Sequence, residues 1–211
     1  MNIIIFGASG GIGKLVVKHA LQEHYTVTAY IRDSQKLKIT DKNLTVIQGE
    51  ISNYAQICAA LSGQDVVIWC VGVPLKRTYS HMASLEGHQL LIKAMHQCHI
   101  SRLIDWATPS VPFYQDKKSM LTVFPGILAG IIFKQAKQEM IAIGQLVEHS
   151  DLDWTIVRFL APQNGPYTGK VKVSFGDTKI NFAISREDIA AFMVAQIKDN
   201  RYIHSMPIIG G

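Results

Sequence analysis

Cysteine is scarce in this chain of 211 residues, and the three that occur show no paired spacing. Cys58, Cys70 and Cys98 therefore suit neither a disulfide framework nor a zinc site, which favours a reducing compartment. His96 and His99 lie three residues apart within a helix-like segment, but no third ligand accompanies them. We therefore expect no metal site.

Long hydrophobic runs are also missing. The longest, Leu121 to Phe133, has about 13 residues and contains Pro125, whereas a membrane-spanning helix needs roughly 20. Met1 is followed at once by a strand-like segment, which leaves no room for the basic region of a signal peptide. We therefore expect a cytoplasmic protein without a membrane segment.

Charge is moderate and slightly basic, with 18% charged residues and a formal net charge of +5. Such an excess suits an anionic ligand, for example a nucleotide phosphate. No cluster of lysine and arginine supports binding to nucleic acid. The hydrophobic content of 48% is typical of a globular protein with a real core.

Strand-like and helix-like segments alternate along almost the whole chain. The pattern predicts strands near residues 2–6, 26–31, 44–48, 65–70, 102–106 and 153–158. It predicts helices near residues 11–23, 53–61, 82–98, 135–149 and 186–197. Strands separated by helices of this length form parallel sheets through right-handed crossovers. We therefore expect an α/β fold, a Rossmann-type doubly wound parallel sheet with helices on both faces, in a single domain over residues 1–211.

Two segments in the second half interrupt this alternation. Residues 109–133 are long and apolar, and they are either a buried loop or a hydrophobic lid over a flat substrate. Residues 170–183 alternate between apolar and polar positions around Gly176-Asp177, which predicts a hairpin. These segments predict a small C-terminal hairpin and loop region on the substrate side of the fold.

A glycine-rich turn joins the first strand to the first helix. It consists of Gly7, Ala8, Ser9, Gly10, Gly11, Ile12 and Gly13. In a dinucleotide-binding turn the first glycine permits the tight bend, the second lets the backbone approach the pyrophosphate, and the third lets helix and strand pack closely. The helix N-terminus then offers amide hydrogens to the phosphates. A strand before and a helix after favour this function over a turn with no ligand.

The end of the second predicted strand bears on the choice between NADP and NAD. An arginine there accommodates the 2′-phosphate of NADP, whereas an acidic residue binds the ribose hydroxyls of NAD. Arg32 and Asp33 are both present, but Asp33 precedes Ser34 in a way typical of a helix cap. We therefore predict NADP as the cofactor, with NAD as the alternative.

The chain resembles a known family over nearly its whole length: the atypical short-chain dehydrogenases with an NAD(P)-binding, NmrA-like fold. This group includes the biliverdin-IXβ and flavin reductases and proteins called NADH-flavin reductases. The segments that carry the resemblance are Gly7–Gly13, Ile31–Asp33, Gly49–Ile51, Val71-Gly72, Leu152–Arg158 and Ile184–Ala190.

The resemblance implies several cofactor contacts. Glu50 and Ile51 would lie near the adenine, although the family usually has aspartate at the position of Glu50. Val71 and Gly72 would face the adenosine ribose. Phe159, Leu160 and Ala161 would line the nicotinamide ring, and Phe159 stands where the family commonly has proline.

The resemblance leaves the catalytic residues open. Thr108 stands where these proteins often place a serine after the fifth strand, close to the nicotinamide. Tyr114 and Lys118 match the letters of the Tyr-x-x-x-Lys pair of ordinary short-chain dehydrogenases, but they follow Thr108 too closely and lack a helical pattern. Lys134 or Lys137 is the other candidate for the lysine that holds the nicotinamide ribose, unless both are solvated.

These features lead to two hypotheses. The first is an NAD(P)H-dependent oxidoreductase, monomeric or homodimeric, that reduces a small planar acceptor such as a flavin or quinone by direct hydride transfer, with a proton from solvent. The second is a non-catalytic, NAD(P)-sensing regulatory protein of the NmrA type. An open apolar pocket over the nicotinamide would favour the enzyme, and a filled one would favour the sensor.

Overall fold

The computed structural model describes residues 1–74, 76, 78–119 and 133–211. Within these ranges, eight strands form one sheet in the order β3-β2-β1-β4-β5-β6-β10-β8. Its first six members follow the strand order of a Rossmann sheet. Their bounds are β1 (Asn2–Phe6), β2 (Thr26–Ile31), β3 (Leu44–Gln48), β4 (Val66–Trp69), β5 (Arg102–Ala107) and β6 (Asp153–Arg158).

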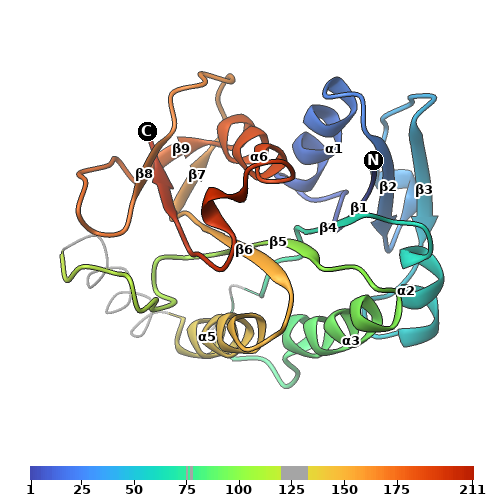
Figure 1. Ribbon diagram of the computed structural model, residues 1–211, viewed down its shortest axis with the longest axis horizontal. Coiled ribbons are helices and arrows are strands. Elements are labelled where there is room, and N and C mark those ends of the chain that lie inside the picture. Colours follow the sequence, from blue (N-terminus) through green and yellow to red (C-terminus); the bar gives the residue numbers. More distant parts are fainter. Residues whose placement is uncertain (75, 77, 120–132) are drawn as a thin grey trace.

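Helices cover both faces of this sheet (Figure 1). On one face lie α1 (Gly13–Gln22) and α6 (Arg186–Ala195), and on the other lie α2 (Tyr54–Leu61), α3 (Ala83–Gln97) and α5 (Lys134–Glu148). Side chains of β1 alternate between the two layers. Ile3 and Ile5 pack with α1 and α6, whereas Ile4 and Phe6 pack with α2, α3 and α5. Burial on both faces explains why these strands are continuous apolar runs.

The predicted fold class is confirmed. Each of the six predicted strands matches its observed counterpart to within one residue at either end, and the helices match to within two. The α1 helix begins later than predicted because the glycine turn continues through Ile12. Short 3₁₀ turns at η1 (Ser34–Lys36) and η2 (Asn200–Tyr202) complete the connections.

The hairpin predicted over residues 170–183 is wrong in its strand pairing. A turn does form at Gly176-Asp177, but β8 (Lys172–Ser174) pairs antiparallel with β10 (Ile208–Gly210) at the sheet edge. The segment after the turn leads into β9 (Ala183–Ser185), which pairs in parallel with β7 (Ala161–Gln163). The chain terminus supplies a partner strand for β8 that short-range alternation does not reveal.

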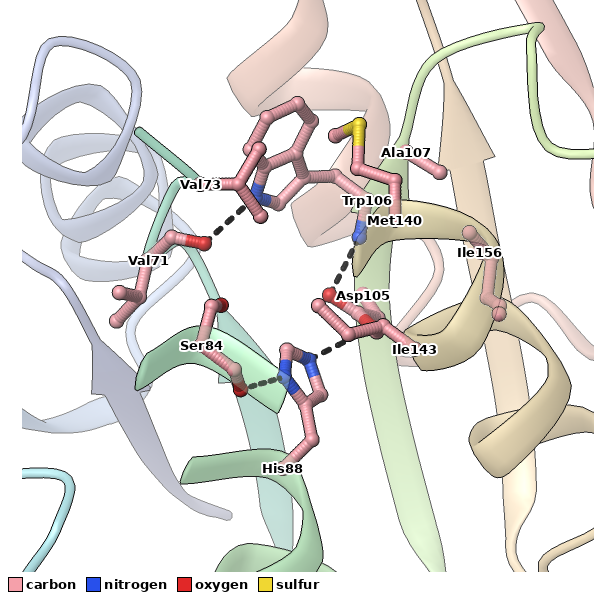
Figure 2. A pocket seen from close by; sticks show the side chains of 11 residues that line it. Val71, Val73, Ser84, His88, Asp105, Trp106, Ala107, Met140, Ile143 and Ile156 are labelled. Atoms are coloured by element: carbon pink, nitrogen blue, oxygen red, sulfur yellow. Dashed lines mark hydrogen bonds and ion pairs between the residues drawn. The ribbon is translucent and has the colours of Figure 1, made fainter. Parts of the chain in front are cut away.

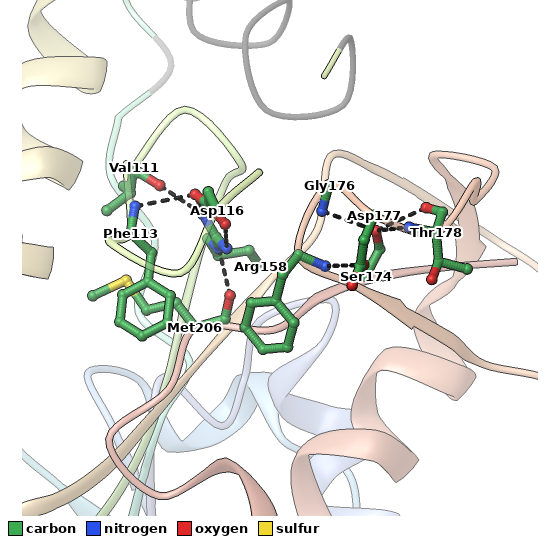
Figure 3. A network of polar contacts seen from close by, with 10 residues as sticks. Val111, Phe113, Asp116, Arg158, Ser174, Gly176, Asp177, Thr178 and Met206 are labelled. Carbon is green, nitrogen blue, oxygen red and sulfur yellow. Dashed lines mark hydrogen bonds and ion pairs between the residues drawn. The ribbon is translucent and has the colours of Figure 1, made fainter. Parts of the chain in front are cut away.

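The long apolar segment predicted at residues 109–133 lies largely outside the described residues, which resume at Phe133. Its beginning is anchored by Arg158, which is fully buried at the end of β6 (Figure 3). Two guanidinium nitrogens of Arg158 donate to the carboxylate of Asp116 at 2.7 and 2.6 Å. Arg158 also donates to the carbonyls of Val111 and Met206. A bidentate pair of this kind fixes the loop after β5 against the sheet.

No helix within the described residues is both long and apolar enough to cross a membrane.

Candidate functional site

A cleft of about 490 Å³ lies at the carboxyl ends of strands β1 to β4. This is where doubly wound sheets bind ligands, because the strand order reverses between β1 and β4. Residues from five segments line it. They are Gly7, Ser9, Gly10, Tyr30, Ile31, Arg32, Gly49, Glu50, Ile51, Ser52, Cys70, Val71, Gly72, Pro74, His81, Ala83, Ser84 and Glu86.

The glycine turn forms one wall of this cleft. Gly7 has a φ of +73°, and a Cβ there would lie 2.7–2.8 Å from the backbone of Cys70 and Val71. A Cβ on Gly13 would collide with the carbonyl oxygen of Gly7. Both positions therefore require glycine, as the sequence predicted for a dinucleotide-binding turn.

The N-terminus of α1 has no cap of its own. Its N-cap residue, Ile12, makes no side-chain hydrogen bond, and the first turn holds no acidic residue. Within the described residues, the amides of Gly11, Ile12 and Gly13 make no hydrogen bond. Unsatisfied amides and the positive end of the helix dipole together form an anion site.

Arg32 and Asp33, at the end of β2, have separate roles. Arg32 is exposed and lines the cleft. Asp33 is the N-cap of η1, where its carboxylate accepts from the amide of Gln35 at 3.1 Å and pairs with Lys36 at 3.4 Å. The prediction that Asp33 is a cap is therefore confirmed. Arg32 is therefore available to a ligand in the cleft, whereas the Asp33 carboxylate caps η1.

Glu50 and Tyr30 lie on the opposite wall. The Tyr30 hydroxyl donates to the Glu50 carbonyl at 3.0 Å. Burial, and then the nearby Glu50 carboxylate, raise the pKa of Tyr30 to about 12. Tyr30 therefore stays neutral and supports the Glu50 backbone, while the exposed Glu50 and the half-buried Ile51 line the cleft.

The N-terminus of α3 also faces the cleft, but a carboxylate from another helix occupies it. Glu139 of α5 is fully buried, and it accepts from the amides of Ser84 and Leu85 at 3.0 and 3.1 Å. The Tyr79 hydroxyl donates to the same carboxylate at 2.6 Å. Burial and the Glu139 hydrogen bond raise the pKa of Tyr79 above its ordinary value. The anion site of α3 is thus filled by the chain itself.

Beyond Val71 the site becomes aromatic. Trp106 of β5 is half-buried, and its indole nitrogen donates to the Val71 carbonyl at 3.2 Å. Its ring stacks on Phe159, with centroids 5.3 Å apart and planes at 19°. Phe159 is buried, and Leu160 and Ala161 follow it with partial exposure. None of these last three residues lines the cleft described above.

Of the predicted catalytic residues, Thr108 lies against the middle of α5, whereas Lys134 lies at the start of that helix. Thr108 follows β5 directly, and its hydroxyl lies 2.6 Å from that of Ser110 and 3.7 Å from the Met140 sulfur. Lys134 is the exposed first residue of α5, so it precedes Met140 by about 9 Å of helix rise. Lys137 is one turn closer and shares a face with Met140.

The Tyr114 and Lys118 pattern does not lie on a helix. Residues 114–118 form a turn and irregular backbone, and Tyr114 is 77% exposed. This is not the helical geometry in which a Tyr-x-x-x-Lys pair lies one above the other.

Sequence reasoning missed several polar residues around the site: Ser84, His88, Asp105, Ser110, Tyr79 and Glu139. His88 and Asp105 are buried, and their side chains lie 3.1 Å apart. Both left a signal in the sequence. His88 shares a helical stripe with Leu91 and Met95, and Asp105 interrupts a strand that is otherwise apolar on both faces.

Comparison with known proteins identifies the cofactor class. A family model described as NAD(P)H-binding matches residues 7–200. The prediction of an NAD(P) cofactor is therefore confirmed.

Among curated relatives, UPF0659 protein C216.03 of Schizosaccharomyces pombe is 26% identical over 224 residues, which cover 95% of this chain and 86% of that protein. Three other curated relatives are longer than this chain. The match covers 33% of the photosystem II assembly factor Ycf39 of Cyanophora paradoxa, 31% of a 2-alkyl-3-oxoalkanoate reductase of Shewanella oneidensis and 65% of a probable pinoresinol-lariciresinol reductase 3 of Arabidopsis thaliana.

Solved structures share the fold. ChuY of Escherichia coli O157:H7, described as an anaerobillin reductase, has a TM-score of 0.80 at 20% identity, with 100% of this chain and 97% of that chain covered. A short-chain dehydrogenase/reductase of Veillonella parvula in complex with NADP has a TM-score of 0.78 at 20% identity, with 100% and 94% covered. At this identity the likeness concerns the fold alone.

Proposed function

This chain belongs to the NAD(P)H-binding family, and we propose that it is an NADPH-dependent reductase that transfers hydride to a planar, apolar acceptor such as a quinone or flavin. The observation that carries the proposal is the stacked pair of Trp106 and Phe159 beside Val71, next to the cofactor cleft. A half-buried indole at this place offers a flat apolar surface to a flat acceptor. Proteins that share the fold include one described as an anaerobillin reductase.

The preference for NADPH rests on Arg32. Its guanidinium has the planar fork that binds phosphate oxygens with two hydrogen bonds. Asp33, the residue that would favour NADH, is held in the η1 cap. The pyrophosphate would bind the amides of Gly11 to Gly13, since these make no hydrogen bond within the described residues and directly follow the cleft-lining residues Ser9 and Gly10.

With the pyrophosphate at the start of α1 and the 2′-phosphate at Arg32, the other predicted residues would contact the remaining parts of the cofactor. Glu50 and Ile51 would border the adenine, and Val71 and Gly72 the adenosine ribose. Phe159, Leu160 and Ala161 would lie beyond Trp106, on the nicotinamide side. Thr108, with its hydroxyl paired to Ser110, would orient the acceptor or the carboxamide. Lys134 or Lys137 would hold the nicotinamide ribose.

Turnover tests the proposal directly. Purified protein, NADPH and menadione or FMN should show a falling nicotinamide absorbance. Trp106→Leu should raise the acceptor KM more than the dissociation constant of NADPH, because it removes the whole indole face but only one hydrogen bond, to the Val71 carbonyl, at the cofactor cleft. Tight NADPH binding without turnover on any acceptor would instead favour the regulatory, NAD(P)-sensing alternative.

Calorimetric titration tests the cofactor preference. Arg32→Ala should weaken NADPH binding about ten-fold or more and leave NADH binding unchanged, since a charged hydrogen bond contributes about 1.5–3 kcal/mol. Lys36→Ala is the matched control, because Lys36 pairs with Asp33 and does not line the cleft. Equal losses for both cofactors would contradict the role of Arg32.

A further inference from the structure

His88 of α3 and Asp105 of β5 form a buried pair behind the cofactor cleft (Figure 2). Their side chains are 2% and 1% exposed. Nδ1 of His88 lies 2.7 Å from the Ser84 carbonyl oxygen, and Nε2 lies 3.1 Å from Oδ2 of Asp105. The other oxygen of Asp105 accepts from the Trp106 amide at 2.7 Å.

These contacts determine how many protons the pair holds. A carbonyl oxygen only accepts, so Nδ1 of His88 must carry a hydrogen. With Nδ1 protonated, the contact between Nε2 and Oδ2 is a hydrogen bond only when a second proton sits on one of those two atoms. The pair therefore stores one proton between His88 and Asp105, in addition to the hydrogen on Nδ1.

A small cavity beside this pair shares two lining residues with the cleft. His88, Asp105, Ser84 and Trp106 line it together with apolar side chains, and it has room for about one water molecule. Ser84 and Val71 also line the cofactor cleft. The Ser84 hydroxyl is buried and has no hydrogen-bond partner among the described residues. Ser84 is the polar residue that lines both spaces.

Other ionisable groups near this cavity are Cys70, Tyr79 and Glu139, and we expect none of them to donate a proton to the acceptor. Cys70 lines the cleft, and burial and then the Asp105 charge raise its pKa, so it stays a thiol. Glu139 is bonded to the first turn of α3 and to Tyr79. Because burial and Glu139 raise the pKa of Tyr79, that hydroxyl also keeps its proton.

We propose that the His88–Asp105 pair supplies the proton that completes reduction of the acceptor, and that it delivers this proton through the Ser84 hydroxyl and a water in the cavity. The proposal rests on the proposed function. Hydride from NADPH carries two electrons to a quinone, which leaves NADP⁺ and the hydroquinone monoanion. The Ser84 hydroxyl gives its hydrogen to that anion and takes one from the pair through the water. Solvent then restores the proton of the pair.

Two acceptors separate proton delivery from hydride transfer. A quinone needs a hydride and a proton, whereas a tetrazolium cation becomes its neutral formazan by taking a hydride alone. Ser84→Ala removes the hydroxyl but leaves the backbone carbonyl that His88 contacts. Ser205→Ala is the matched control, a buried serine on the far side of β6. Asp105→Asn is the second variant, and circular dichroism checks that each protein folds.

We expect Ser84→Ala and Asp105→Asn to lower quinone turnover about 100-fold, the scale of general acid catalysis, with the loss increasing toward alkaline pH. The ratio of quinone turnover to tetrazolium turnover should fall about 100-fold in both variants. Ser205→Ala should match wild type with both acceptors. Equal loss with both acceptors, or no loss with quinone in the folded Ser84→Ala variant, would overturn the proton route and leave the reductase intact. A wild-type protein that reduces neither acceptor would overturn the proposed function, and the proton route with it.

Discussion

Two helix N-termini face the cofactor cleft, those of α1 and α3, and they are treated in opposite ways. The first turn of α1 has no cap, no acidic residue and three amides without a hydrogen bond within the described residues. The first turn of α3 is bonded to the buried carboxylate of Glu139. Both ends carry the same partial positive charge. Only the first is left for an external anion.

Two other described helices, α2 and α6, are capped by their own side chains, whereas α5 has no side-chain cap at Phe133 and no acidic residue in its first turn. Asn53 caps α2 by accepting from the amide of Gln56. Ser185 caps α6 by accepting from the amide of Asp188. Of the two helices whose first turns lack a side-chain cap, α1 and α5, only α1 begins directly after the cleft-lining residues Ser9 and Gly10.

We expect the largest effect from a carboxylate placed beside the α1 N-terminus, because both helix N-termini at the cleft would then be occupied by the chain's own charges. Ser9→Asp places a negative charge where the pyrophosphate would bind, so we expect NADPH affinity to fall about 100-fold or more, which is about 2.7 kcal/mol. The free energy of unfolding should stay level or rise by about 0.5 kcal/mol, since an acidic residue suits a helix N-terminus.

Ser9→Asn is the control of nearly equal shape without the charge. Calorimetry and urea unfolding measure the two quantities separately. An equal loss of affinity in both variants would mean that shape and not charge excludes the cofactor.

Loss of the carboxylate at α3 should have the next largest effect. Glu139→Gln weakens three charge-assisted hydrogen bonds, one to the buried amide of Ser84 and two to part-buried donors, so we expect the free energy of unfolding to fall by about 2 kcal/mol. Urea denaturation measures this. Glu23→Gln, an exposed change at the end of α1, should stay within about 0.5 kcal/mol of wild type. An unchanged stability in Glu139→Gln would mean that α3 does not need its filled N-terminus.

Acid should weaken α6 through Asp188. Burial alone would raise the pKa of this carboxyl, but hydrogen bonds from Thr168, Ser185 and Gly169 outweigh it, and the pKa lies below its ordinary value. A pKa depressed in the folded state gives stability above the unfolded pKa of about 3.9, and this stability is lost as pH falls through the folded pKa.

Asp188→Asn should therefore cost about 1–2 kcal/mol near neutral pH, and its stability should fall less steeply than that of wild type below about pH 4. Urea unfolding at a series of pH values measures both slopes. Parallel slopes for the two proteins would contradict the role of Asp188.

The smallest expected effect concerns the neutral cap of α2. Asn53→Ala removes the hydrogen bond to the amide of Gln56, so stability should fall by about 1 kcal/mol. Asn53→Asp keeps an acceptor at the same place and should restore it. If Asn53→Ala were as stable as wild type, satisfying a helix N-terminus would contribute little to stability in this fold, and the difference between α1 and α3 would lose its energetic basis.

Local chemistry made much of the site predictable. The glycine turn, Arg32 and the cap at Asp33 all lie within short segments that the sequence shows directly, although Gly7 must be glycine because of the backbone of Cys70 and Val71, far along the chain. Pairing across distance was not predictable in this way. The partner of β8 is β10, which closes the chain, and Arg158 pairs with Asp116, 42 residues away.

By itself, the sequence determined the Rossmann sheet and the order of its elements, because apolar periodicity acts between near neighbours, and its glycine turn predicts where the dinucleotide would bind. Tertiary structure alone decided which helix N-terminus stays open. Glu139 meets Ser84 across 55 residues, and His88 meets Asp105 only because α3 packs on β5. A buried charge takes whatever partner the packing brings within hydrogen-bond distance, and no short sequence pattern records that choice.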